Sequence, residues 1–473
     1  MSSFKVLLIN PPPFVSKKES RKMDKLFLSN EPFGLLSITA VLLEHQIDCH
    51  FLDARAEMFD INQTIQYIKK IEPVIIGIPI LTPDAFVTEE LLLNIQEEIS
   101  DAIVVIGNLH ASIFYDYYLR KKICDFVVHG EGELIMLNLC KMLAEKKDPG
   151  QVNGISFIKE DEIINTKRED LIQDLDSLPM IARHVAPMDK YVQKINHGAN
   201  NKCFHMMTSR GCPIGCKFCC VHSGRKVRMN TADNVLDEIG FLVDKYGADE
   251  ILFYDPMFLS SRDRTLRICE GIRKRFPKLT WKCEAHINFI NEELLKELKA
   301  SGCTMLFYGI ETGNNELLKV IGKKTTIETI TEKVNLTVKY GIKVYGFFIL
   351  GIPGETREMS KKTIQLSLDL PLEFAQFTIF TPFPGSEMFL QLKDEKRIDP
   401  FAWDKYYTFA GFTDNDPIYT PDGRTSEEIK ELQRKAIRSF HLRPKHIFKQ
   451  ALKLRPHNIS QAITAFKMVV FSR

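Results

Sequence analysis

Short, almost continuously apolar runs alternate with longer amphipathic segments over the first 150 residues. The apolar runs are rich in Val, Ile, Leu and Phe and lie at 4–9, 48–52, 74–78, 102–106 and 124–128. The segments between them have helical spacing and lie at 34–45, 61–71, 84–99 and 131–146. Apolar strands that alternate with helices are typical of a parallel sheet covered on both faces. We therefore predict a Rossmann-like (flavodoxin-like) α/β domain over residues 1–150, which binds ligands beyond the carboxyl ends of its strands.

A second alternation follows a predicted hairpin and linker at 151–202. Candidate strands lie at 203–209, 250–254, 279–284, 305–310, 343–350 and 374–380. Candidate helices lie at 234–246, 262–275, 292–301, 327–340 and 355–368. Six βα units predict a partial (β/α)6 barrel over 203–395, with its chemistry at the carboxyl ends of the strands. Residues 396–473 are predicted to form a C-terminal helical region with a basic amphipathic tail.

Composition excludes several classes of protein. The 473 residues suffice for two or three domains, and 63 Lys and Arg against 61 Asp and Glu leave a net charge of +2, so no nucleic-acid binding is expected. No apolar stretch is long enough to cross a bilayer, and the N-terminal residues lack the features of a signal peptide. Many of the eleven cysteines are scattered singly, which suits a reducing compartment, so we predict a cytoplasmic protein.

A tight cysteine cluster follows the first strand of the predicted barrel. Its spacing is Cx3Cx2C, formed by Cys212, Cys216 and Cys219. Three thiolates can bind three irons of a [4Fe–4S] cluster and leave the fourth iron open to a small molecule. Gly211 and Gly215 permit the tight turns that such a loop needs, and Phe218 can pack against the cluster or its ligand.

A structural zinc site is the alternative for this cluster. Zinc normally takes four ligands, and Cys220 or His222 would have to supply the fourth. Zinc sites often use paired Cx2C sets, and no second spaced pair occurs in the sequence, so the iron–sulfur interpretation is favoured.

The Cx3Cx2C motif after the first strand of a βα barrel resembles the signature of radical S-adenosylmethionine (SAM) enzymes. Segments 253–258, 307–313, 347–355 and 381–386 resemble further motifs of this family at matching strands. The resemblance implies SAM contacts from Phe218, Asp255, His286 and Glu311. His286 stands where relatives often carry Arg in a Cys-x-Ala-Arg pattern, and the alternative is a partly buried core histidine.

The first domain resembles the cobalamin-binding domain that precedes the barrel in one radical SAM subgroup. The matching segments are 8–13, 31–36, 77–82, 107–112 and 130–133. The resemblance implies cobalamin contacts from Pro12, Pro13, Thr82, Gly107, Asn108, His110, Gly130 and Glu131. The Asp-x-His-x-x-Gly motif of some cobalamin proteins is absent from the sequence, so His110 is expected as a loop contact rather than a cobalt ligand.

Two alternatives remain open for this first domain. One is a Rossmann-like module that has lost its ligand. The other is a dinucleotide site, which is disfavoured because the GxGxxG fingerprint is missing.

The two resemblances together imply an enzyme similar to class B methyltransferases and to the anaerobic magnesium-protoporphyrin IX monomethyl ester cyclase. Such an enzyme would cleave SAM to a 5′-deoxyadenosyl radical, with a low-potential electron donor such as flavodoxin or ferredoxin, and act on a small-molecule substrate. We expect a cobalamin-dependent C-methyltransferase acting on an unactivated carbon. The alternatives are a radical cyclisation or oxidation without methyl transfer, and a non-catalytic cobalamin or Fe–S sensor.

The C-terminal tail has its own pattern. From Phe440 to Arg473 there are seven Lys or Arg and no acidic residue, and 444–471 is amphipathic. One interpretation is peripheral contact with an anionic membrane surface or a lipid-like substrate. The other is a terminal helix that packs on the barrel and exposes its basic face.

Overall fold

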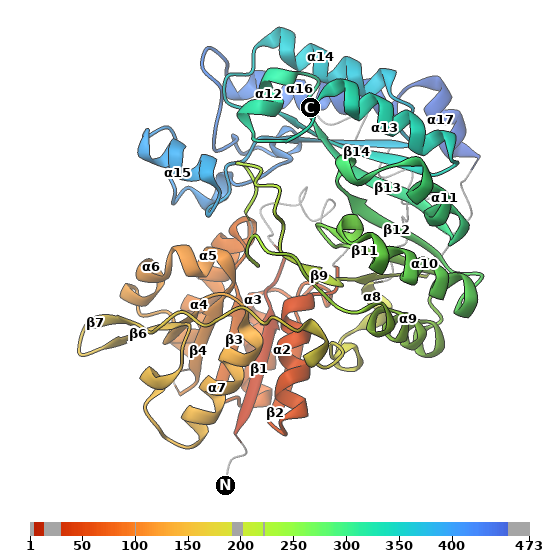
Figure 1. Cartoon of the computed structure of the whole chain (residues 1–473). Helices are drawn as coiled ribbons and strands as arrows, with labels where there is room; N and C mark the ends of the chain where they lie inside the picture. Colours follow the sequence, from red (N-terminus) through yellow and green to blue (C-terminus); the bar gives the residue numbers. More distant parts are fainter. Residues whose placement is uncertain (1–3, 14–29, 100, 192–201, 221–222, 453–473) are drawn as a thin grey trace. The chain divides into compact units, whose positions relative to one another are not determined.

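The computed structural model describes residues 4–13, 30–99, 101–191, 202–220 and 223–452. The chain divides into two compact units, Met1–Tyr191 and Val192–Arg473. Each unit is built round its own large sheet (Figure 1). We describe the two units separately.

The sheet of the first unit has seven strands in the order β2-β1-β3-β4-β5-β6-β7. Their bounds are Lys5–Asn10 (β1), Asp48–Asp53 (β2), Ile75–Pro79 (β3), Ile103–Gly107 (β4), Phe126–Val128 (β5), Ile155–Lys159 (β6) and Glu162–Asn165 (β7). The first five pair in parallel, and the predicted hairpin adds β6 and β7 as antiparallel strands at the β5 edge. Strand order reverses between β1 and β3, and open α/β sheets bind ligands at such a switch point.

Helices cover both faces of this sheet, because the strand order reverses at the switch point. They are α2 (Phe33–Glu44), α3 (Ile61–Ile71), α4 (Ala85–Glu98), α5 (Asn108–Ile113), α6 (Tyr115–Arg120) and α7 (Gly132–Ala144). Right-handed connections that run in opposite directions along the sheet place their helices on opposite faces. Accordingly α2 packs beside α7, and α3 packs beside α4 (Figure 1).

The second unit contains a six-stranded parallel sheet in strictly sequential order, the half-barrel of the sequence prediction. Its strands are β8 (Cys203–Met206), β11 (Glu250–Phe253), β12 (Thr280–Ala285), β13 (Cys303–Glu311), β14 (Lys343–Leu350) and β15 (Phe374–Ile379). A separate two-stranded antiparallel pair, β9 (Ser209–Arg210) and β10 (Arg228–Met229), closes the base of the cysteine loop. The predicted fold class is confirmed.

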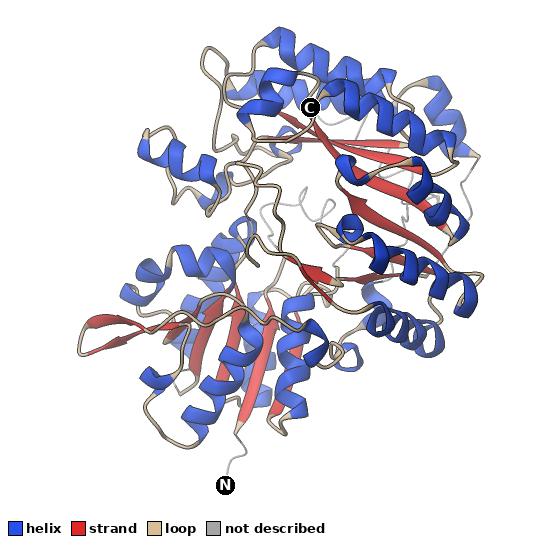
Figure 2. Ribbon diagram, viewed as in Figure 1, coloured by secondary structure: helices blue, strands red, loops and turns tan. Residues whose placement is uncertain are grey.

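The second unit has helices that lie mostly on one face of the half-barrel (Figure 2). They are α9 (Ala232–Tyr246), α10 (Arg262–Arg275), α11 (Glu292–Ala300), α12 (Asn315–Val320), α13 (Ile327–Lys339), α14 (Arg357–Asp369), α15 (Glu387–Asp394), α16 (Ser426–His441) and α17 (Pro444–Ala451). The hydroxyl groups of Tyr308 and Thr337 lie 2.8 Å apart and join β13 to α13. Tyr308 therefore projects to the helix-covered face, and its neighbours along β13 project to the other face.

Two predicted boundaries differ from the structure for a local reason. The strand predicted over 203–209 ends at Met206, because the Asp255 carboxylate accepts hydrogen bonds from the Thr208 backbone and hydroxyl. The helix predicted from residue 355 begins at Arg357, because the Thr356 side chain caps it. In the first place a side chain takes a backbone donor near the strand end, and in the second a side chain satisfies an N–H group of the first helical turn that has no partner within the helix.

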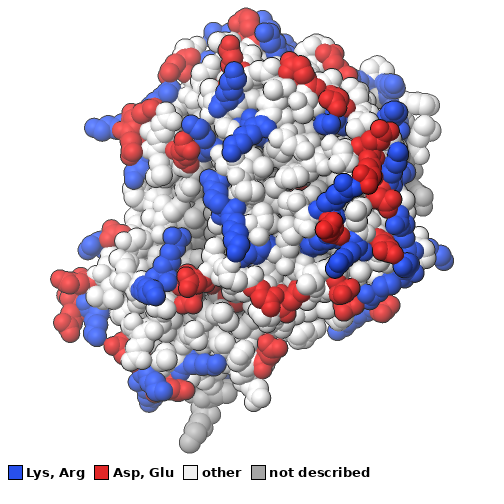
Figure 3. Space-filling view, in the orientation of Figure 1, with Lys and Arg blue, Asp and Glu red and all other residues white. Residues whose placement is uncertain are grey.

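The surface carries charges of both signs. Figure 3 shows Lys and Arg interspersed with Asp and Glu on the face in view, in keeping with the small net charge. Within the described residues, no helix has the length and apolar character needed to cross a membrane.

Candidate functional site

The cysteine loop begins at a position that only glycine tolerates. Gly211 has φ +91°, and a Cβ atom there would lie 2.2 Å from the carbonyl oxygen of Lys226 on the returning strand. The Cys212 N–H also donates to the Gly224 carbonyl at 3.2 Å. The two ends of the loop are therefore held together independently of any ligand.

The same loop is bound to segments that follow two other strands. The Lys217 N–H donates to the Ile321 carbonyl at 2.9 Å, and the Lys217 carbonyl accepts from the Met388 N–H at 3.0 Å. The Cys220 thiol lies 3.4 and 3.2 Å from the carbonyl oxygens of Phe383 and Pro384. The Cys220 thiol thus contacts the segment after β15.

The three motif cysteines provide the donor set that an iron–sulfur cluster needs. Cys212 and Cys216 are half-buried and Cys219 is exposed. Burial, and then the charges of Cys216 and Cys212, raise the pKa of Cys219 to about 11. Iron coordination would deprotonate these thiols. Phe218, between the last two, is half-buried.

Among the described residues, no three His, Cys, Asp or Glu side chains are close enough together to bind a single metal ion. A cubane cluster binds each thiolate through a different iron, so its cysteines need not converge on one point. The thiols and their chemistry fit such a cluster.

Asp255, which follows β11, lies at the start of the cysteine loop. Its Oδ1 accepts hydrogen bonds from the Thr208 N–H at 2.8 Å and the Ser209 hydroxyl at 2.6 Å. Its Oδ2 is buried and has no hydrogen-bond partner among the described residues. Burial raises the pKa of Asp255 to about 6, although hydrogen bonds from Ser209 and Thr208 oppose the shift. One oxygen therefore anchors the loop and the other is left for a ligand.

Glu311 ends β13 in a left-handed conformation, with φ +66°, at a register shift beside Gly309. Its Oε1 accepts a hydrogen bond from the Lys323 ammonium at 2.8 Å, and both side chains are nearly buried. A Cβ at Gly309 would lie 2.2 Å from that Oε1 and 2.6 Å from Lys323 Nζ, so a larger residue would displace the ion pair from its present position.

Lys323 is the residue that sequence reasoning missed. Burial lowers the pKa of Lys323, but the negative charges of Glu311, Cys216 and Cys219 outweigh it and hold the pKa above its usual value. A positive charge therefore lies between the predicted cluster ligands and Glu311. The only sequence signal was a Gly-Lys pair after a short helix, which is common in loops.

His286 lies next to this charge. It is 9% exposed, and its Nδ1 accepts from the Asn288 N–H at 3.4 Å. Its Nε2 is buried without a hydrogen-bond partner among the described residues. Burial and then the charge of Lys323 lower the pKa of His286 to about 4, so the imidazole is neutral near pH 7. Lys323, rather than His286, supplies positive charge there.

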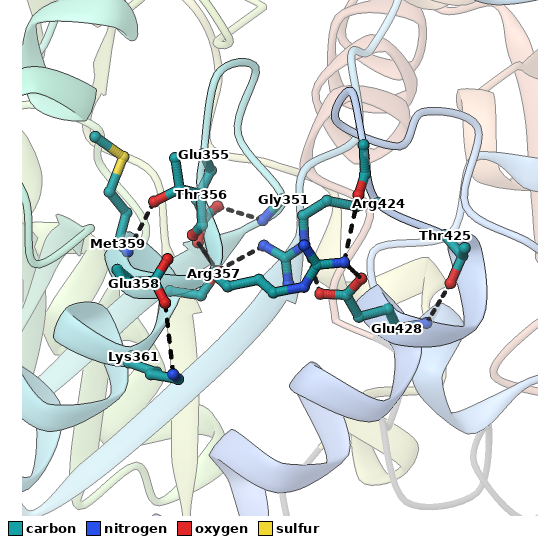
Figure 4. A network of polar contacts seen from close by, with 12 residues as sticks. Gly351, Glu355, Thr356, Arg357, Glu358, Met359, Lys361, Arg424, Thr425 and Glu428 are labelled. Atoms are coloured by element: carbon teal, nitrogen blue, oxygen red, sulfur yellow. Dashed lines mark hydrogen bonds and ion pairs between the residues drawn. The ribbon is translucent and has the colours of Figure 1, made fainter.

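The segment after β14 is fixed by a polar network that Figure 4 shows from close by. Glu355 turns back and accepts from the N–H groups of Gly351 and Ile352 and from the Ser360 hydroxyl. Arg424, just before α16, donates to Ser360 at 2.8 Å. The C-terminal region therefore holds this strand end in place.

Arg424 also pairs with Glu428 at 2.9 Å, and Glu428 binds Arg357 at 2.7 Å. These contacts extend the network onto the first turns of α14 and α16 (Figure 4).

In the first unit, the predicted cobalamin residues lie beyond the carboxyl ends of neighbouring strands. Pro12 and Pro13 follow β1 and are buried. Thr82 follows β3, and His110 lies in α5 after β4. The structure thus brings these loops to one edge of the sheet.

His110 is fully engaged within the first unit. Its Nδ1 lies 3.1 Å from the Thr82 hydroxyl, and its Nε2 lies 3.0 Å from the Tyr118 hydroxyl. Burial lowers the pKa of His110 to about 3, so it is neutral. With both ring nitrogens in hydrogen bonds, His110 holds the β3 and β4 loops together and has no nitrogen available for cobalt.

Small residues leave room at the same edge. Gly130 has φ +93°, and a Cβ there would meet no atom within 4 Å; the same open space surrounds Gly34 at the start of α2. Gly107 leads into Asn108, which has φ +77° and accepts from the Leu109 N–H at 2.7 Å. Such open backbone can approach a corrin ring closely.

The remaining side chains there are polar anchors and exposed apolar groups. The Glu131 carboxylate accepts from the Ile172 N–H at 2.9 Å and fixes the loop after β5. Leu81 is 48% exposed and Phe86 is 55% exposed, beside Thr82. An apolar face and open glycines fit a flat corrin, and no charged cluster is needed to hold it.

Comparisons with known proteins agree with both halves of this description. A radical SAM superfamily family model matches residues 206–367, and a B12 binding domain model matches residues 23–139. An uncharacterized methyltransferase, PH0819 of Pyrococcus horikoshii, is 31% identical over the full length of both chains.

Two further proteins resemble the chain over most of its length. The anaerobic magnesium-protoporphyrin IX monomethyl ester cyclase of Cereibacter sphaeroides is 27% identical over 84% of this chain and 64% of its own. The cobalamin-dependent SAM radical enzyme OxsB superposes with a TM-score of 0.74 at 18% identity, over 99% of this chain and 72% of that chain, which shows a shared fold.

The chain belongs to the radical SAM superfamily, in the group whose members carry a B12 binding domain before the radical SAM domain. The predicted family, the prediction of an enzyme rather than a sensor, and the predicted cofactors are confirmed. The cofactors of this class are a [4Fe–4S] cluster, SAM and cobalamin. The chain is a cobalamin-binding, methyltransferase-like radical SAM enzyme.

Proposed function

We propose that this enzyme is a cobalamin-dependent C-methyltransferase that acts on an unactivated carbon of a small molecule. The observation that carries the proposal is full-length similarity to a protein named as a methyltransferase, at 31% identity without unmatched domains on either side. When bound, the cluster and SAM supply a 5′-deoxyadenosyl radical, and cobalamin supplies a methyl carrier.

We assign the cluster to Cys212, Cys216 and Cys219. Phe218, between the last two thiols, would contact SAM. The hydrogen bonds of the loop to Gly224, Ile321 and Met388 hold the sulfurs in position before any ligand arrives. A preformed loop of this kind avoids ordering costs when the cluster is built.

We assign SAM to the buried polar groups next to that loop. Glu311 accepts a hydrogen bond from Lys323, which presents positive charge. The unpaired Oδ2 of Asp255 and Nε2 of His286 are the acceptors or donors left for a ligand. Buried polar atoms without partners are costly, so a bound ligand that satisfies them is stabilised.

We assign cobalamin to the strand ends of the first unit. Pro12, Pro13, Gly107, Asn108, Gly130 and Glu131 would contact it through backbone and loop side chains. Thr82 and His110 would contact it from the same strand ends. His110 positions these loops because its two hydrogen bonds join them.

Product analysis tests the reaction type. Anaerobically reconstituted enzyme, a low-potential reductant and SAM bearing a trideuterated methyl group are incubated with a small-molecule extract. Methyl transfer predicts a labelled product, with S-adenosylhomocysteine and 5′-deoxyadenosine formed in equal amounts. 5′-Deoxyadenosine without S-adenosylhomocysteine would contradict it and favour radical cyclisation or oxidation, which the similarity to the ester cyclase supports. Flavodoxin and ferredoxin are the electron donors to compare with a chemical reductant.

We also propose peripheral membrane contact through the tail. Only residues up to Leu452 of the predicted amphipathic segment lie within the described part. There Ile447, Phe448 and Leu452 are 41%, 67% and 73% exposed, beside the exposed Lys445. Apolar side chains flanked by lysines are typical of helices that lie on anionic bilayers.

Sedimentation with vesicles tests this contact. The full chain should bind phosphatidylglycerol vesicles more than phosphatidylcholine vesicles, and Phe448→Ser should weaken binding several-fold. Phe401→Ser, at another exposed phenylalanine (51%), is the matched control. Equal binding to both vesicle types would refute contact with a specifically anionic membrane surface. Absence of binding to either type would favour packing of the tail on the barrel.

A further inference from the structure

The helix-free face of the half-barrel carries a row of side chains that the cofactor assignments do not use. Glu284 on β12 is the register partner of Phe307 on β13, which is the partner of Tyr345 on β14. Register partners in a parallel sheet project to the same face. Tyr308 points to α13, so its neighbour Phe307, and with it Glu284 and Tyr345, projects away from the helices.

Aromatic rings form a wall along this face. The rings of Phe307 and Tyr345 stack with centroids 5.1 Å apart. Phe347 adds a third ring, 5.1 Å from Tyr345 and 6.1 Å from Phe307. Tyr345 and Phe347 are only half-buried. Exposed aromatic faces bind flat apolar groups and attract cations.

One pair of charges on this face is already neutralised. Lys282, two residues before Glu284, lies 2.8 Å from Glu250, and both side chains are almost fully buried. The lysine closest in sequence to Glu284 on this face therefore has its own partner.

Glu284, in contrast, makes no hydrogen bond or ion pair with any described residue. Its carboxylate is half-buried. Asp255 lies near enough to act on it: burial and then the charge of Asp255 raise the pKa of Glu284 to about 7. Asp255 is itself fully buried, with Oδ2 unpaired in the described part of the chain. The face thus presents the Glu284 carboxyl group, unpaired among the described residues, beside an aromatic wall.

We propose that this face binds the substrate, and that the substrate combines a flat apolar body with a cationic group such as a protonated amine. The body lies against Phe307, Tyr345 and Phe347, and the cation faces Glu284. This inference rests on the proposed function, because it names the class of molecule on which the proposed reaction acts.

SAM shares part of this chemistry, because it has a flat adenine and a cationic sulfonium. The position in the strands favours the substrate. His286 and Glu311 lie at or after the ends of β12 and β13, whereas Phe307 and Tyr345 lie inside their strands. Phe307 and Tyr345 therefore lie below the level of the SAM candidates, whereas Glu284 lies one residue before the end of β12 and two residues before His286.

Binding of two dyes to the full-length, reconstituted enzyme tests the proposal. Thioflavin T is flat and cationic, and 1-anilinonaphthalene-8-sulfonate is aromatic and anionic. At pH 8, above the pKa of Glu284, the enzyme should bind thioflavin T, and Glu284→Gln should weaken that binding roughly tenfold. Binding of the anionic dye should not weaken. Tyr345→Leu should weaken binding of thioflavin T as well.

Matched variants make the result specific. Glu316→Gln removes the same charge from the exposed start of α12 and should change neither dye. Thioflavin T affinity that is equal in wild type and Glu284→Gln would overturn the proposal. If Glu284→Gln does not fold, Glu284→Asp keeps the charge and should still prefer the cationic dye. Equal affinity of Glu284→Asp for the two dyes would then overturn it.

A second measurement separates substrate from SAM. SAM binding is followed by the change that SAM causes in the electron paramagnetic resonance spectrum of the reduced cluster. Glu284→Gln should leave that change intact, and its loss would assign the face to SAM and refute the proposal. Dye binding needs no turnover, so a failure of methyl transfer would refute the proposed function without deciding this inference.

Discussion

The two cofactor regions are formed by different kinds of residues. The barrel region gathers thiols, an ion pair and unpaired buried polar atoms from several strand ends. The edge of the first sheet uses glycines with open space around them, and a histidine whose hydrogen bonds are satisfied internally. We therefore expect the barrel region to bind its ligands through bonds and charge, and the first sheet to bind through shape. Single substitutions should therefore cost far more in the barrel.

Removal of one cluster ligand should have the largest effect. Cys216→Ala is expected to abolish cluster assembly and with it all SAM cleavage, since two thiolates do not hold a site-differentiated cubane. Iron and sulfide content and the absorption spectrum after anaerobic reconstitution measure this. Cys220→Ala is the control, because its thiol contacts the carbonyls of Phe383 and Pro384, and it should keep the cluster. A zinc-loaded protein, or loss of the cluster in Cys220→Ala, would contradict the assignment.

Removal of the buried cation, Lys323, should have the second-largest effect. Lys323→Met leaves Glu311 buried without its partner, which costs about 3–5 kcal/mol of stability when a buried pair is broken. Thermal unfolding measures that loss, and calorimetric titration measures SAM binding, which should weaken.

The double variant Lys323→Met, Glu311→Gln separates the two effects. It should regain much of the stability but not the SAM affinity. Full recovery of SAM binding would show that Lys323 acts only on stability.

A smaller effect should follow acidification of the first unit. The pKa of His110 is lowered in the folded state, so the neutral imidazole stabilises the fold above the unfolded pKa of about 6.5, and this stability is lost as pH falls toward 3. Between pH 7 and pH 5 the loss is roughly 2 kcal/mol. His110→Gln should flatten this pH dependence in urea unfolding. The visible spectrum of bound cobalamin should be the same in both proteins, and a changed spectrum would make His110 a cobalt ligand.

The smallest effect should come from the open glycine. Gly130→Ala forces a side chain into a left-handed conformation, at about 1 kcal/mol, without meeting any atom of the described residues within 4 Å. Cobalamin affinity should fall further than stability if the corrin occupies that space. Gly423→Ala, with φ +71° and equally open surroundings in the second unit, should alter stability alone. Equal cobalamin affinity in wild type and Gly130→Ala would show that the corrin does not lie against this loop.

The sequence by itself determined the order of strands and helices in both units, because apolar periodicity records which side of each element is buried. It also determined the cysteine loop, since Cys212, Cys216 and Cys219 are close in sequence. Their Cx3Cx2C spacing is enough to predict a loop that binds an iron–sulfur cluster. Caps such as Asp60 and Thr326 mark helix starts through short-range hydrogen bonds, so several of these boundaries were predicted to within a residue or two.

Tertiary structure alone decided which distant side chains meet. Lys323 joins Glu311 and the cluster loop only when the segment after α12 folds back, and an isolated lysine in a sequence gives no sign of its partner. The hydrogen bonds of His110 to Thr82 and Tyr118 likewise depend on the order in which strands assemble. Glu284 is distinguished from other glutamates by the face on which its strand register places it. Periodicity records burial, but the partners of a charge are set by contacts between segments far apart in the chain.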